Sequence, residues 1–495
     1  MDEADAVDGG TNVYISMGTY DEDVSGVSAS LFGGYDASDG WSRDIDANTT
    51  TINGQTEYGV ELVGVNGTTV AIDGLTVNGA DSVAGTSAGV FLEGNNVLVS
   101  RNVLTGGDDS TASVGLLVSG VAPTWLTVVD NVIDTGTGAT TTAAGFYGFI
   151  AGPSSFINNE IGSQDSSTGA TYGAVLAPFA GSFLFHGNTF TAGDAGVGNS
   201  IAVYHLQQQP HSLWFENNEV MGGESTTGGS VGIYSIAGGH WNVVNNYVAS
   251  TDALTSSIGG AFAYGGSLFA DGNDFIVDGT ATGTAIAFYS ALKSTSFVTN
   301  NFADGGDADD ISVGFALVSE DGSAVVSNNT FLGGSGDKSY GVYAAFDYNS
   351  FPPSVQFINN AVDAGTGTTS AVNVSDWSDA NLGAWFMYNN NFSGASPDCI
   401  VYTDFDTGCE TDIADVDECD WFNCGVAMGN LDETPGFVNP GSGNFHLLGT
   451  SNLIDAGINP LTVLGLPGND TLFIDYDGEN RPAGGGWDIG FDEVP

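Results

Sequence analysis

The chain has 495 residues, of which 60 are acidic and five are basic, and its formal net charge at pH 7 is −55. This charge repels nucleic acid and anionic membranes, so no nucleic-acid partner is expected, and it repels polyanionic polysaccharides unless calcium bridges them. Seventy-four glycines, few methionines and many Thr, Val and Phe residues suit short strands joined by turns. No stretch approaches 18 consecutive apolar residues, so no transmembrane segment is expected.

The first residues, Met1-Asp2-Glu3-Ala4-Asp5, are acidic and lack the basic start and apolar core of a signal peptide. Either export information is missing from this chain or the protein is intracellular, and the cysteines considered below favour the first reading. Residues 1–55 are expected to form an N-terminal cap and the first coils.

A repeat begins at residue 102 and fixes the architecture. Eleven anchor asparagines, 27 to 31 residues apart, are each followed two positions later by a large apolar residue. Such a period is the signature of a solenoid. The anchors are Asn102, Asn131, Asn159, Asn188, Asn218, Asn246, Asn273, Asn300, Asn329, Asn360 and Asn390.

The residue three positions before each anchor is also apolar. Positions −3 and +2 are five apart, and in a straight strand they would face opposite sides. Both can be buried only if the chain bends between them. Asn tolerates the left-handed conformation of such a bend, and its amide can bond to the equivalent amide one coil away. We therefore predict a strand, an Asn turn and a second strand, with the anchors stacked as a ladder.

A third apolar run lies upstream in each unit and often opens with Gly, as in Gly232-Ile233-Tyr234 and Gly341-Val342-Tyr343. Three strands per repeat predict an all-β fold, a parallel β-helix of roughly 13 coils. We expect residues 56–395 to form the ladder-containing helix and residues 396–495 to form a disulfide-pinned C-terminal cap.

Acidic residues are scattered through the polar loops, where they are most simply a solubilising coat. Calcium sites are the sharper alternative, and Asp304, Asp307, Asp309 and Asp310 are the candidate ligands. The doublets Asp108-Asp109 and Asp309-Asp310 could in principle pair as hydrolase acids. A lyase would need a cationic base, yet Arg101 and Lys293 belong to coils far apart along the repeat. We assign no catalytic residue.

Trp125, Trp214, Trp241 and Trp385 precede anchor asparagines by four to six residues. They either fill the core or stand outward as platforms for sugar rings, beside His205, His211 or His240. Recognition of a glycan would require several of them on one flank.

All four cysteines, Cys399, Cys409, Cys419 and Cys424, lie within 26 residues. An even, local set in an otherwise cysteine-free chain predicts two disulfides formed in an oxidising compartment. Three pairings are possible. We favour the sequential one, Cys399 with Cys409 and Cys419 with Cys424, because it closes the shortest loops. Zinc is the alternative, but the spacing lacks a paired C-x2-C and His446 is the only imidazole nearby.

Both ends of the chain resemble known families. Residues 13–20, 31–35, 41–44 and 51–54 are similar to the opening of bacterial secreted right-handed β-helix proteins of the pectate-lyase-like fold. The C-terminal part resembles the domain called choice-of-anchor Q, most clearly at Cys419-Asp420-Trp421-Phe422-Asn423-Cys424 and Trp487-Asp488-Ile489-Gly490-Phe491-Asp492-Glu493. Two departures are the absence of an anchor before the chain stops at Pro495 and Leu453 in place of a frequent Cys. The resemblance implies an exported surface protein with a right-handed helix, and it implies no chemistry.

Arg481 is one of five basic residues and is expected to lock the cap by pairing with Asp455, Asp475 or Asp488. The run that starts at Asp475-Tyr476-Asp477-Gly478 is not an EF-hand, because its twelfth position is Gly486 where Glu is needed.

Three functions stay open. The first is a non-catalytic, exported cell-surface or extracellular scaffold or adhesin with an acidic, calcium-binding surface. The second is a carbohydrate-binding or polysaccharide-degrading protein, and the third is a filament built by end-to-end stacking. No cofactor is expected to be required, calcium is the candidate ligand, and extracellular glycans or further copies of the chain are the candidate partners.

Overall fold

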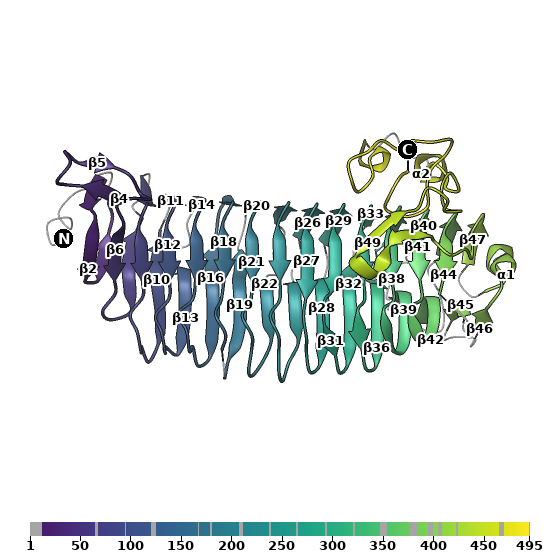
Figure 1. Ribbon diagram of the computed structural model, residues 1–495, viewed down its shortest axis with the longest axis horizontal. Helices are drawn as coiled ribbons and strands as arrows, with labels where there is room; N and C mark the ends of the chain where they lie inside the picture. The colour runs from purple at the N-terminus through teal and green to yellow at the C-terminus, as the bar shows by residue number, and fades with distance from the viewer. Residues whose placement is uncertain are drawn as a thin grey trace. The chain divides into compact units, whose positions relative to one another are not determined.

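The chain folds as an all-β parallel β-solenoid of about 12 turns, close to the number expected (Figure 1). The computed structural model describes residues 12–64, 68–94, 96–119, 125–166, 168–178, 181–206, 211–236, 239–263, 266–292, 295–319, 322–346, 354–376, 384–394, 399–403, 408–421, 424–464 and 470–494. The chain divides into two compact units, Met1–Gly239 and His240–Pro495. Within the described ranges, no helix has the length and apolar character needed to cross a membrane.

In the first unit each full turn contributes one strand to each of three parallel sheets, A, B and C. Sheet A contains β1 (Asn12–Ser16), β4 (Ser30–Asp36), β8 (Thr69–Asp73), β11 (Asn96–Ser100), β14 (Trp125–Val129), β17 (Ser154–Ile157), β20 (Ser182–His186) and β23 (Ser212–Glu216), and β5 (Ser42–Arg43) pairs antiparallel with β4. Sheet B contains β2 (Gly18–Asp21), β6 (Thr50–Asn53), β9 (Thr76–Asn78), β12 (Val103–Thr105), β15 (Val132–Asp134), β18 (Glu160–Gly162), β21 (Thr189–Thr191) and β24 (Glu219–Met221). Sheet C contains β3 (Val24–Val27), β7 (Tyr58–Val63), β10 (Thr86–Glu93), β13 (Ala112–Val118), β16 (Thr142–Ile150), β19 (Ala170–Pro178), β22 (Ser200–His205) and β25 (Ser230–Ser235).

The second unit repeats this arrangement. Its A strands are β26 (Gly239–Val244), β29 (Gly266–Asp271), β33 (Ser296–Thr299), β37 (Ala324–Ser327), β40 (Ser354–Ile358), β43 (Ala384–Tyr388) and β47 (Cys424–Met428). Its B strands are β27 (Tyr247–Ser250), β30 (Asp274–Val277), β34 (Phe302–Asp304), β38 (Thr330–Leu332), β41 (Ala361–Asp363) and β44 (Asn391–Ser393). Its C strands are β28 (Ser256–Ala263), β32 (Thr284–Leu292), β36 (Ile311–Ser319), β39 (Ser335–Phe346), β42 (Thr366–Asp376) and β45 (Cys399–Thr403). Sheet C also includes the short strands β31 (Thr280–Ala281) and β35 (Asp307–Ala308), and β46 (Gly408–Glu410), which pairs antiparallel with β45.

The bend between sheets A and B uses a left-handed residue, but not the ladder asparagine predicted to supply it. The positive-φ residue comes one position earlier. Only Gly, and to a lesser extent Asn and Asp, adopt this conformation at low cost, and these three types fill all but one of the positions. They are Gly74, Arg101, Asp130, Asn158, Gly187 and Asn217 in the first unit and Asn245, Gly272, Asn300, Asn328, Asn359, Asn389 and Gly429 in the second.

The predicted asparagine ladder is present in each unit. Within a unit, the buried amide of each ladder residue except the last donates from Nδ2 to the Oδ1 of the ladder residue in the next coil, at 2.8–3.0 Å. The ladder residues are Asn102, Asn131, Asn159, Asn188 and Asn218 in the first unit and Asn246, Asn273, Asn301, Asn329, Asn360, Asn390 and Asn430 in the second.

One predicted anchor was wrong and one ladder residue was missed. Asn300 is the left-handed residue at its bend, and its neighbour Asn301 occupies the ladder. Asn430 extends the ladder by one coil past the last predicted anchor. At the other anchors both flanking positions are buried as expected, for example Val99 and Leu104 at 0% exposure.

The predicted disulfide pairing is confirmed. Cys399 bonds Cys409 across the β45–β46 hairpin, and Cys419 bonds Cys424 between the short helix α1 (Ile413–Glu418) and β47, with Cα separations of 5.2 and 5.4 Å. Asp412 caps the N-terminus of α1. The disulfides therefore pin the strands of the last coil.

Residues 432–464 and 470–494, called the flap below, do not sit beyond the last coil. They fold back along the second unit, as the yellow ribbon beside β38 and β41 shows (Figure 1). The flap contains β48 (Phe437–Asn439), η2 (Pro440–Ser442), β49 (Asn444–Leu447), α2 (Pro460–Leu464) and η3 (Asp470–Phe473). Its apolar side chains Leu447, Leu453 and Ile489 form a buried cluster with Ala361 of β41.

Candidate ligand-binding groove on sheet C

Of the four tryptophans proposed as sugar platforms, two are buried and the two exposed ones are not neighbours. Trp241 and Trp385 are buried in the core of the second unit. Trp125 and Trp214 are 38% and 45% exposed on β14 and β23 of sheet A, with β17 and β20 between them. Three strand spacings separate the two strands by about 14 Å. The pair does not form a continuous stacking surface.

The three histidines considered beside these tryptophans do not form one site either. His205 and His211 are buried with ring centroids 4.8 Å apart. Burial lowers the pKa of His205 well below its usual value, and the neighbouring His211 lowers it further. His240 is exposed, and its Nδ1 lies 2.6 Å from Ser267 Oγ. The first two rings are core residues of the first unit.

The outer face of sheet C carries the aromatic side chains instead. In the first unit Tyr147, Tyr172, Tyr204 and Tyr234 are half-buried, and they lie in two rows that run from coil to coil. Tyr172 and Tyr204 stack with centroids 5.7 Å apart and planes 17° apart, and Tyr204 lies 5.8 Å from Tyr234. The face presents a run of ring surfaces to solvent.

In the second unit the same face is hollowed into a groove of about 570 Å³. One row across neighbouring coils reads Tyr289, Ala316, Tyr343, Asn373 and Tyr402. In this row Ala316 lies between two tyrosines and is buried. The lining residues are Thr284, Ile286, Tyr289, Ile311, Val313, Ala316, Val318, Lys338, Tyr340, Tyr343, Thr368, Ser370, Asn373, Cys399 and Tyr402.

The chemistry of this groove differs from that of the chain as a whole. None of the described residues that line it is an Asp or a Glu, although the chain has 60 of them. Lys338, one of the five basic residues, lies at its edge, and Asn373, Ser370 and the tyrosine hydroxyls supply hydrogen-bonding groups. Tyrosine faces flanked by a few polar groups suit the apolar faces and hydroxyls of a neutral sugar.

The sequence contains a signal for these tyrosines, which was missed because each third strand was treated only as an apolar run. In Gly145-Phe146-Tyr147, Gly232-Ile233-Tyr234 and Gly341-Val342-Tyr343 the middle residue is fully buried, whereas the tyrosine is half-buried. Successive residues of a strand face opposite sides, so the tyrosine after an inward residue points outward.

The four candidate calcium ligands are not gathered into one site. Asp304 is half-buried and accepts the backbone N–H of Gly306 at 3.1 Å, and Asp307 is exposed and accepts the hydroxyl of Ser335. No three of the described residues Asp304, Asp307, Asp309 and Asp310 place ligand atoms within 4.8 Å of one another.

Arg481 is paired, but not with the predicted partners. Its Nη1 donates to Glu493 Oε2 at 3.0 Å, and both side chains are fully buried. Asp455 and Asp488 instead accept backbone N–H groups of the flap, from Gly486 and Asp455 respectively. The flap contains more acidic residues than one arginine can pair with, so the sequence alone could not show which of them bonds Arg481.

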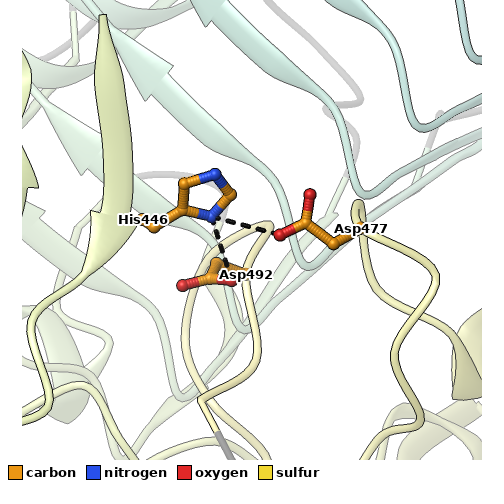
Figure 2. Close-up of side chains that lie close together, drawn as sticks. All are labelled: His446, Asp477 and Asp492. Carbon is orange, nitrogen blue, oxygen red and sulfur yellow. Dashed lines mark ion pairs between the residues drawn. The ribbon is translucent and has the colours of Figure 1, made fainter.

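A second polar cluster lies in the flap, where His446 of β49 meets Asp477 and Asp492 (Figure 2). Its Nδ1 lies 3.1 Å from Asp492 Oδ1 and 3.5 Å from Asp477 Oδ2. No sequence motif pointed to this set, because the three residues come from separate parts of the flap.

Comparison with protein-family models found no match, and comparison with curated proteins found none. The fold thus defines the class as a parallel β-solenoid with C-terminal disulfides.

Proposed function

We propose that this protein is a non-catalytic, exported β-solenoid scaffold or adhesin that holds an uncharged polysaccharide along the sheet C groove. The observation that carries the proposal is a tyrosine-lined groove free of carboxylates among its described lining residues, in a chain of net charge −55. The acidic surface repels polyanions, while the groove offers stacking faces and no carboxylate among its described lining residues.

The lining also argues against turnover in the groove. Hydrolysis of a glycosidic bond usually requires two carboxyl groups, one on each side of the bond. The groove residues include none. Beside Lys338, the described lining residues include no carboxylate that could hold the calcium a lyase of this fold would place next to its base. Binding without cleavage is the function that this residue set supports.

Export and calcium belong to the same proposal. Two disulfides are typical of proteins that mature in an oxidising compartment, which supports an extracellular or cell-surface location. The motif resemblance supports a divergent choice-of-anchor Q domain in residues 396–495, and the acidic loops are candidates for calcium binding.

Affinity electrophoresis in gels that contain soluble cellulose, xylan, mannan or polygalacturonate tests the proposal. The mobility of the protein should fall with at least one neutral polymer, with and without calcium, and should not fall with polygalacturonate in the presence of chelator. Tyr343→Ala and Tyr289→Ala should each weaken retardation by about tenfold, because each removes a stacking face.

The exposed Trp214→Ala on sheet A is the matched control and should bind as the wild type does. Loss of binding in Trp214→Ala with full binding in the tyrosine variants would move the site to sheet A. Absence of retardation by every polymer would reject glycan binding.

A further inference from the structure

His446, Asp477 and Asp492 bring three segments of the flap to one point (Figure 2). His446 lies on β49, Asp477 lies in the turn after η3, and Asp492 lies near the C-terminal end of the described chain. One potential ligand atom from each residue lies within 4.8 Å of the other two. Among the described residues this is the group of His, Cys, Asp or Glu side chains that meets this condition.

We propose that these three residues bind one divalent transition-metal ion of the zinc class. A tetrahedral zinc ion with N and O ligands at about 2.0–2.1 Å keeps neighbouring ligand atoms about 3.3 Å apart. The two distances from His446 Nδ1, 3.1 and 3.5 Å, lie on either side of that value. The two distances that involve the imidazole thus already match those of a zinc site, and the two carboxylates lie within 4.8 Å of each other.

The donor types select the metal. Calcium and magnesium take oxygen ligands, whereas an imidazole nitrogen favours zinc and related ions. The site therefore differs from the calcium expected at the acidic loops.

The cluster is held in place by contacts outside the three ligands. Asp492 is 7% exposed, and its Oδ2 accepts the Leu447 N–H at 2.9 Å. Among the described residues, its Oδ1 has His446 as its partner and none outside the cluster. The His446 ring packs on Phe491 with centroids 5.6 Å apart. Such supporting contacts fix the direction of metal ligands.

Further carboxylates and a solvent cavity lie next to the three proposed ligands. Asp274 of β30 is close enough to interact electrostatically with both His446 and Asp477, and it accepts the Tyr476 hydroxyl at 2.7 Å. A cavity of about 510 Å³ lies beside the cluster, with Asp274, Asp475 and Asp477 in its wall. The buried Arg481 is engaged by Glu493. A dication would offset this excess of carboxylates, and water from the cavity can complete its coordination.

A bound ion would join β49, the 474–478 turn and the C-terminal end of the flap at one point. The same region contacts the solenoid, because Phe445 stacks on Phe302 of β34 at 4.5 Å. The ion would therefore cross-link three segments of the flap next to the point where the flap contacts sheet B.

Chelator-treated full chain should be titrated with zinc chloride by calorimetry, with excess calcium present, and its metal content should be measured after desalting. One zinc per chain is expected, together with a higher midpoint of thermal unfolding. Asp477→Asn and His446→Gln should each weaken zinc binding at least tenfold. Asp477 is 48% exposed at its side chain, so its variant should fold.

Asp432→Asn, an exposed acid of the same flap, is the matched control and should bind zinc as the wild type does. Absence of stoichiometric zinc in the wild type would overturn the proposal. Equal binding by Asp477→Asn and His446→Gln would also overturn it, because zinc would then be held elsewhere on the acidic surface.

Discussion

The paired asparagines of the bend have separate roles. In Asn158-Asn159 the first residue has a φ of 53° and is exposed, while the second is buried in the ladder. The same division explains the error at Asn300. Either Asn fits the pattern of an apolar residue three positions before and two positions after the anchor. Phe297 and Phe302 hold these positions for Asn300, and Val298 and Ala303 hold them for Asn301. Spacing and apolarity alone could not separate the two positions.

Asn159→Ala should destabilise the first unit by about 2–4 kcal/mol. The change removes the acceptor of both the Asn131 N–H and its Nδ2, and it removes the donor to Val128 O and Asn188 Oδ1. Buried groups would be left without partners. Thermal unfolding followed by circular dichroism measures the effect.

Asn158→Gly is the control for this change, because Gly adopts the left-handed conformation without strain and occupies the same bend position at Gly187. Its unfolding midpoint should stay near that of the wild type. Equal midpoints for Asn159→Ala and the wild type would contradict a stabilising ladder.

Asp304→Asn should raise stability at pH 7 in the presence of chelator. Burial raises the pKa of Asp304 above its ordinary value of 3.8, and nearby Asp307, Asp278 and Asp363 raise it further, while the Gly306 N–H opposes them. Above the raised pKa the folded state holds a charge at a cost that the unfolded chain does not carry. That cost disappears as the pH falls through the raised pKa toward 3.8.

The gain in unfolding midpoint should therefore shrink as the pH is lowered from 7 to 4. Exposed Asp309→Asn serves as the comparison and should change the midpoint little at either pH. A midpoint of Asp304→Asn below that of the wild type at pH 7 would show that the carboxylate is favourable in the fold.

At the scale of elements, the flap docks on side chains that other coils leave exposed. The bend residue Asn359 is fully buried, and its amide exchanges two hydrogen bonds with Ile458, at 2.7 and 2.8 Å. Asn389 donates to Ala456 O, and Asn300 donates to Ile474 O. Asn158 and Asn217 hold the same backbone position in the first unit but are exposed. The adjacent Asn-Asn pairs are visible in the sequence. Their hydrogen bonds to the flap could not be predicted, because the repeat does not show that the flap folds back along the solenoid.

Asn359→Gly should loosen the flap without opening the solenoid. Gly keeps the left-handed bend but loses both bonds to Ile458, so amide exchange of Ile458 should accelerate by about tenfold. Hydrogen exchange by mass spectrometry can resolve this from the ladder strands, which should stay protected. Asn217→Gly provides the matched change at an uncovered bend and should leave the flap unaffected.

For the whole molecule, the period of the asparagines was sufficient to predict the fold, because each coil must repeat the same bend and bury the same positions. The disulfide pairing also followed from loop length. The groove could not be predicted, because it depends on which residues of neighbouring coils lie side by side, as Tyr289, Ala316 and Tyr343 do. That relation joins residues one coil apart and becomes visible only once the strand register is known.

The most direct test of a binding function in the groove is calorimetric titration of the wild type and Tyr343→Ala with the neutral oligosaccharide that corresponds to the retarding polymer, followed by mass spectrometry of the same sample. The proposal predicts saturable binding by the wild type, about tenfold weaker binding by Tyr343→Ala, and an oligosaccharide of unchanged mass. Equal binding by the two proteins would place the ligand elsewhere, and shortened products would show that the protein is an enzyme.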